Sequence, residues 1–135
     1  MLLLVLLATM SADTRAFHVI VTRANAATSL TEAEVSAMFM KRMRSWPDGS
    51  DVAPVDQRAG SRVRESFSEE IHGKSVRYVI RYWHRLIFSG RGIPPRELES
   101  DAEVLAFVAA NRGAIGYVNA GAALPDDVQV LTVSP

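Results

Sequence analysis

The 135-residue sequence contains no cysteine, which excludes disulfide bonds, thiolate metal sites and a cysteine nucleophile. The three histidines, His18, His72 and His84, do not have the spacing of metal ligands. The Gly-x-Ser-x-Gly pattern that marks many serine nucleophiles is missing too. The sequence therefore predicts no metal site, no cofactor and no enzymatic activity.

The sequence also has no excess of positive or negative charge, because 15 basic residues balance 15 acidic ones. Thirteen of the basic residues are arginine, which suits bidentate contacts with carboxylate or phosphate. Arg77, Arg81 and Arg85 share one face of an expected helix, beside Tyr78 and Tyr82. This face could bind nucleic acid or a partner, or it could be solvated. The neutral balance favours a solvated face, and we expect no nucleic-acid partner.

The chain has one long apolar run, over residues 1–9, which is too short to span a bilayer. Small residues at Thr14 and Ala16 suit a cleavage point before Phe17. We therefore expect a signal peptide over 1–16, a mature domain over 17–135 and a periplasmic location. No Lys or Arg precedes the run. A start further upstream, an uncleaved anchor or a buried first element are the alternatives.

Strands and helices alternate along the rest of the chain, which predicts one α/β domain with a parallel or mixed sheet. Apolar residues make up 48% of the sequence, enough for a core. We expect helices that begin after Thr31, Ser61, Ser75 and Ser100, each a residue that caps a helix well. The helix after Ser100 is apolar on most sides and should be well buried. The expected strands are 17–22, 52–56, 114–118 and 128–133.

The stretch 55–67 is the sharpest candidate for a binding site. It predicts the end of a strand, a turn at Ala59-Gly60-Ser61 and the start of a helix, with three arginines, Arg58, Arg62 and Arg64, close by. Helix N-termini present unpaired N–H groups to anions, and glycine allows close approach. An ordinary turn with Ser61 as the N-cap is the alternative.

Five motifs in order resemble the phosphate-type substrate-binding proteins of ABC transporters, in the periplasmic-binding-protein-like superfamily. They are 30–39, Trp46-Pro-Asp-Gly49, Gly60-Ser61 with Phe67, Phe88-Ser-Gly-Arg91 and Gly113-Ala-Ile-Gly-Tyr117. The resemblance implies a type II fold with a mixed sheet flanked by helices, and an exported protein that binds phosphate or a related oxyanion. Full-length members have two lobes, and this chain is long enough for about one. A membrane transporter and a second lobe or protomer are the implied partners.

The binding turn departs from the family pattern, which has an arginine in the strand and then Ser-Gly-Thr. Here Asp56 lies near the expected arginine, and Ser61 takes the place of the threonine. The resemblance assigns Arg58, Gly60, Ser61 and Arg62 to oxyanion binding, with Arg58 offsetting the charge of Asp56. A buried carboxylate would repel phosphate unless Arg58 or another arginine neutralises it.

Two further hypotheses remain open at this point. The first is an envelope interaction module that has kept the fold and lost anion binding. The second is a small esterase that uses Ser61 as its nucleophile.

Overall fold

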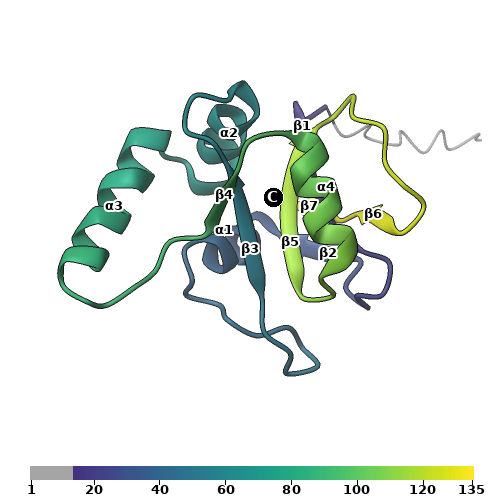
Figure 1. Cartoon of the computed structure of the whole chain (residues 1–135), viewed down its shortest axis with the longest axis horizontal. Coiled ribbons are helices and arrows are strands. Elements are labelled where there is room, and N and C mark those ends of the chain that lie inside the picture. The colour runs from purple at the N-terminus through teal and green to yellow at the C-terminus, as the bar shows by residue number, and fades with distance from the viewer. Residues whose placement is uncertain (1–13) are drawn as a thin grey trace, which may run out of the picture.

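The computed structural model describes residues 14–135, and its centre is a five-stranded mixed sheet (Figure 1). The strand order is β4 (Arg96–Leu98), β3 (Ala53–Gln57), β5 (Ala114–Asn119), β1 (Phe17–Thr22) and β6 (Val128–Val130). β3 is parallel to β4 and β5, whereas β1 is antiparallel to β5 and β6. The mixed sheet predicted from the alternating pattern is thereby confirmed.

Helices cover both faces of this sheet. On one face lie α1 (Glu32–Phe39) and α2 (Arg62–Phe67), and α2 continues as a π-helical segment, η1 (Ser68–His72). On the other face lies α4 (Asp101–Ala110), whose Val104 and Val108 pack on the sheet. The remaining helix, α3 (Val76–Phe88), lies at the side of the molecule, apart from the sheet (Figure 1).

The larger core lies beneath α1 and α2 and contains several aromatic rings. Phe67 stacks on Tyr117 with ring centroids 3.9 Å apart, and Phe39 packs against Phe67 at 4.7 Å. Strand β1 contributes to both cores, with Val19 and Val21 facing α1 and Ile20 facing α4. A sheet buried on both faces explains the near-continuous apolar sequence of β1.

The predicted helix caps are confirmed. The hydroxyls of Thr31, Ser61, Ser75 and Ser100 each accept a backbone N–H from the first turn of the helix that follows. Gly73 ends η1 with a φ of 64°, the left-handed conformation that glycine adopts without strain.

The structure differs from the sequence-based expectation in its short strands. A second sheet pairs β2 (Ser29–Thr31) in parallel with β7 (Thr132–Ser134), and neither β2 nor β4 was expected. Three residues carry too little periodicity to identify a strand. The single closing strand expected over 128–133 is divided at Leu131, whose N–H donates to the carbonyl of Val19 at 2.8 Å.

The helix after Ser100 is also less buried than expected. Only Val104 and Val108 of α4 are buried, because this helix packs on the sheet with one face and leaves the other to solvent. Apolar residues on that outer face blurred the periodicity of the sequence.

The expected signal peptide lies mostly outside the described residues, and its cleavage stays a prediction. Residues 14–16 are packed against the domain. The carbonyl of Ala16 accepts the N–H of Ala120 at 3.0 Å, and Arg15 donates to the carbonyl of Val133 at 2.8 Å. Cleavage before Phe17 would remove both bonds. Within residues 14–135 no helix is both long and apolar enough to cross a bilayer.

His72 makes the folding free energy depend on pH. Burial, together with the nearby cations Arg64 and Arg42, lowers the pKa of His72 to about 4, and its Nδ1 lies 2.7 Å from the Ser36 hydroxyl. The unfolded chain protonates His72 near its ordinary pKa of 6.5, whereas the folded protein does not until about pH 4. Stability from this group is therefore complete above pH 6.5 and is lost as the pH falls to 4.

Between pH 7 and pH 4, His72 should lower the free energy of unfolding of the wild type by about 3 kcal/mol. We expect His72→Asn to lack this part of the pH-dependent loss, as measured by urea unfolding at each pH. His84→Asn, which replaces an exposed histidine, is the matched control variant. Parallel pH profiles for the wild type and His72→Asn would contradict this assignment.

Candidate functional site

The candidate site lies where the three parallel strands end. Gln57, Leu98 and Asn119 are the last residues of β3, β4 and β5, and α2 and α4 begin at the same edge. The chain passes from β3 to β4 on one side and then to β5 on the other. In open α/β sheets, ligands bind outside the carboxyl ends of the strands where the direction of winding changes. The site expected from residues 55–67 therefore lies at the edge that favours ligands.

A cavity of about 420 Å³ opens at this edge. All four residues assigned from the sequence line it, together with residues from β3, β5 and the start of α4. The lining residues are Gln57, Arg58, Gly60, Ser61, Arg62, Val63, Glu99, Ser100, Asp101 and Asn119.

The turn before α2 presents backbone donors, among them those of Gly60 and Arg62. The N–H of Ser61 donates to the carbonyl of Arg58 at 3.0 Å, so it is already used. The N–H groups of Gly60 and Arg62 make no hydrogen bond within residues 14–135. Gly60 also gives room to Arg58, whose Nη1 lies 3.4 Å from the position a Cβ would take.

The hydroxyl of Ser61 has a structural role, because it accepts the N–H of Arg64 at 3.1 Å and caps α2. The esterase hypothesis needs a base beside this hydroxyl. No histidine is among the residues that line the cavity, and His72 is bonded to Ser36.

Two carboxylates share the cavity with the arginines. Asp101 accepts from Gln57 Nε2 at 2.7 Å and from Asn119 Nδ2 at 2.9 Å, so it joins the start of α4 to the ends of β3 and β5. Glu99 is exposed at the rim. With Arg58 and Arg62 opposite, the lining carries two positive and two negative side chains.

Asp56 does not line this cavity. Successive side chains of a strand point to opposite faces, so Asp56 lies beneath α2 while Gln57 contacts α4. The Tyr117 hydroxyl donates to Asp56 Oδ1 at 2.6 Å, and Nε of Arg64 lies 3.7 Å from the same oxygen. Arg64, rather than Arg58, is thus the arginine beside Asp56.

Arg64 is almost fully buried, and a second nitrogen of its guanidinium contacts β4 and the end of β3. Its Nη1 donates to Glu97 Oε1 of β4 at 2.7 Å and to the carbonyl of Gln57 at 2.9 Å. Burial opposes the charge on Arg64, but the carboxylates of Asp56 and Glu97 outweigh it and raise the pKa of the guanidinium.

Burial raises the pKa of Asp56 above its ordinary value, although Arg64 and the bond from Tyr117 act against this. Burial, with Asp56 as neighbour, also raises the pKa of Tyr117, which keeps the phenol protonated as a donor. The sequence interpretation did not identify this cluster. The available signal was an acidic residue in an otherwise apolar strand, which requires a buried partner.

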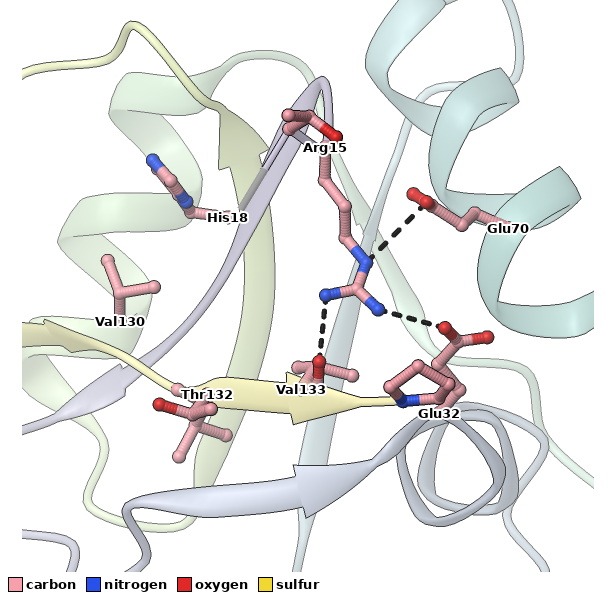
Figure 2. A pocket seen from close by; sticks show the side chains of 10 residues that line it. Arg15, His18, Glu32, Glu70, Val130, Thr132 and Val133 are labelled. Carbon is pink, nitrogen blue, oxygen red and sulfur yellow. Dashed lines mark hydrogen bonds and ion pairs between the residues drawn. The ribbon is translucent and has the colours of Figure 1, made fainter. Parts of the chain in front are cut away.

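A larger cavity, about 690 Å³, lies beside Arg15 and β7. Figure 2 shows Arg15 between Glu32, Glu70 and Val133, with Nη2 2.8 Å from Glu32 Oε1 and Nε 3.6 Å from Glu70 Oε1. The charge of Arg15 is therefore already balanced by two carboxylates. The smaller cavity at the strand ends is lined by two arginines, Arg58 and Arg62.

No family model and no curated protein matches this sequence. Solved structures do resemble it. A Clostridium perfringens protein described as a phosphate ABC transporter substrate-binding protein, with bound phosphate, gives a TM-score of 0.69 at 17% identity, over 87% of this chain and 44% of its own. An ABC-type phosphate transport receptor from Vibrio cholerae gives 0.68 at 17% identity, over 87% and 46%. PstS from Borrelia burgdorferi gives 0.62 at 14% identity, over 87% and 47%.

These likenesses confirm the fold that the motif order implied. The chain has the fold of part of these proteins, a single α/β lobe with a mixed sheet flanked by helices. It spans less than half of the length of the three proteins that it resembles.

Replacing Arg64 by methionine should lower the free energy of unfolding by about 3–5 kcal/mol, because Asp56 would remain buried without its cation. The measurement is urea unfolding at pH 7. Adding Asp56→Asn to Arg64→Met should restore part of the loss, since the amide has no charge to neutralise. The exposed neighbour supplies the control, because Arg62→Met should change stability by less than about 0.5 kcal/mol. Equal losses for Arg62→Met and Arg64→Met would refute the buried ion pair.

Proposed function

We propose that this chain is an exported, solute-binding-protein-like module that binds phosphate or a related oxyanion in connection with ABC-type phosphate transport. The ligand site is the cavity at the strand ends, with Arg58, Gly60, Ser61 and Arg62 as the binding residues. One observation carries the proposal: these four residues meet in one cavity where the N–H groups of Gly60 and Arg62 are unpaired. Backbone donors of this kind at a helix start suit an anion.

The proteins that share the fold support a binding role rather than catalysis. The Clostridium and Vibrio proteins are described by their phosphate-binding or transport role, and the Clostridium protein holds phosphate. The proposal extends this role to the present chain. It places the protein in the periplasm, with a membrane transporter as partner and with a second lobe or protomer closing the site.

The geometry suggests how an oxyanion would sit. The N–H groups of Gly60 and Arg62 would donate to it, the Ser61 hydroxyl hydrogen could turn toward it, and the guanidinium of Arg58 lies over Gly60. Asp56 does not oppose binding, because it is held beneath α2 by Arg64 and Tyr117. A single lobe leaves the anion exposed to water, so binding should be weak and sensitive to salt.

One observation favours the second candidate, an envelope interaction module without a ligand. Glu99 and Asp101 cancel the formal charge of Arg58 and Arg62 in the cavity lining. A site with no net positive charge attracts phosphate less strongly at long range. The two candidates therefore differ in whether the chain alone binds phosphate.

Titration calorimetry of the chain with phosphate and with sulfate tests the proposal. We expect a dissociation constant of about 1 mM at low salt, near −4 kcal/mol, and weaker binding at high salt. Arg58→Gln combined with Arg62→Gln should abolish the heat, because both guanidiniums line the cavity.

Arg77→Gln combined with Arg81→Gln removes the same charge from α3, outside the cavity, and should leave the heat unchanged. Absence of heat at millimolar ligand with the unmodified chain would reject phosphate binding and favour the interaction module. Equal loss in the two double variants would show that only general charge attraction was measured.

Glu99→Gln should strengthen phosphate binding by about threefold to tenfold, because it removes an exposed negative charge from the rim of the cavity. The same calorimetric titration measures this change. Glu69→Gln, at an exposed position on η1 outside the cavity lining, serves as the control. An unchanged dissociation constant for phosphate in Glu99→Gln would show that the anion does not bind beside Glu99.

A further inference from the structure

Helix α3 is only loosely joined to the rest of the protein. Val79 and Trp83 are its fully buried residues, and they pack against Met40 at the end of α1. The ring of Trp83 also lies close to Gly92 in the loop that follows. Figure 1 shows the helix as an arm at the side of the molecule, away from the sheet.

The exposed apolar side chains of the protein gather on this arm. Five large apolar residues are exposed within residues 14–135, and four of them, Tyr78, Ile87, Phe88 and Ile93, belong to α3 and the loop after it. Phe88 is 96% exposed and Ile93 is 76% exposed. Single exposed apolar residues are common, but a cluster of them marks an interaction surface.

The same segment is strongly positive. Residues 71–96 contain six basic residues and no acidic one, which leaves nine basic and fifteen acidic residues in the rest of the chain. Arg77, Arg81, Arg85 and Arg91 are all exposed. The balanced net charge therefore conceals a basic arm on an acidic body.

We propose that α3 and its following loop dock on an anionic membrane surface. The arginines would contact lipid phosphates, while Phe88 and Ile93 would enter the region between headgroups. We call Arg81, Arg85, Arg91, Ile87, Phe88 and Ile93 the α3 surface. Basic residues around aromatic and aliphatic side chains are the composition of helices that lie in a membrane interface. Anionic lipids attract such residues over about one Debye length.

Charge and shape favour lipid over the other occupants. In a two-fold dimer the same arginines would face one another and repel, which argues against a second copy. The hollow beside Phe88, lined by His84, Arg85 and Ser89, is shallow and open. Two further cavities border the α3 surface, one of about 630 Å³ beside Arg91 and Ile93 and one beside Ile87. Phe88 lines neither of them and is 96% exposed, which suits insertion among lipid headgroups.

Sedimentation with lipid vesicles tests this proposal. The protein is the full chain carrying Leu4→Asp and Leu6→Asp, which break the apolar run of residues 1–9 so that only the domain can contribute. We expect binding to vesicles of phosphatidylcholine and phosphatidylglycerol in equal parts, reduced by salt, and no binding to phosphatidylcholine alone.

Two double variants separate charge from apolar insertion. Arg81→Gln with Arg85→Gln should weaken binding about thirtyfold, as expected for the loss of two arginines near the lipid surface. Phe88→Ser with Ile93→Ser should weaken it by about tenfold or more. Arg23→Gln with Arg112→Gln removes equal charge from loops outside α3 and should bind like the parent. All six residues are exposed, and thermal melting confirms that each variant is folded.

Three outcomes would overturn the proposal. They are equal binding to both kinds of vesicle, equal loss in the α3 variants and the Arg23/Arg112 control, and binding of soluble poly-glutamate without binding to vesicles. None of these depends on phosphate, so the result is independent of the proposed ligand site.

Discussion

The buried ion pair between Asp56 and Arg64 is the interaction on which the candidate site depends. It joins β3 to the first turn of α2, Tyr117 of β5 donates to the same carboxylate, and Glu97 of β4 holds the other end of the guanidinium. Asp56 and Arg64 thus connect three parallel strands and one helix. Because side chains alternate along a strand, anchoring Asp56 on one face presents Gln57 on the other, at the floor of the cavity.

Much of the fold could be predicted from the sequence, because long elements carry clear signals. The helix caps at Thr31, Ser61, Ser75 and Ser100 rest on local chemistry, and the structure has them. Strand β2 could not be predicted, because its three residues pair with β7, about a hundred residues away. Burial of α4 was overestimated, because an apolar composition does not say which face a neighbour covers.

The candidate site was predictable in position but not in its balance of charge. The turn at Gly60-Ser61 is a local pattern, so its place at the strand ends followed from the order of strand and helix. Glu99 and Asp101 reach the same cavity only because α4 begins beside α2, a long-range arrangement that no local motif encodes. The sequence suggested a conflict between Asp56 and an anion. The structure shows instead that Asp56 is buried with a cation of its own, and that the carboxylates at the cavity come from another element.

The arginines of this chain have three different roles, which depend on how deeply each side chain is buried. Arg64 is enclosed, so its charge is compensated at short range and acts on stability. Arg58 and Arg62 stand at an open cavity beside carboxylates, where their effect on a ligand depends on the acids around them. The arginines of α3 face solvent, and the segment that carries them contains no acidic residue. Arg58, Arg62 and Arg64 lie within seven residues, and the sequence pattern alone grouped them as one basic turn. Only the direction of each side chain distinguishes a cation that holds the sheet together from cations that could receive an anion.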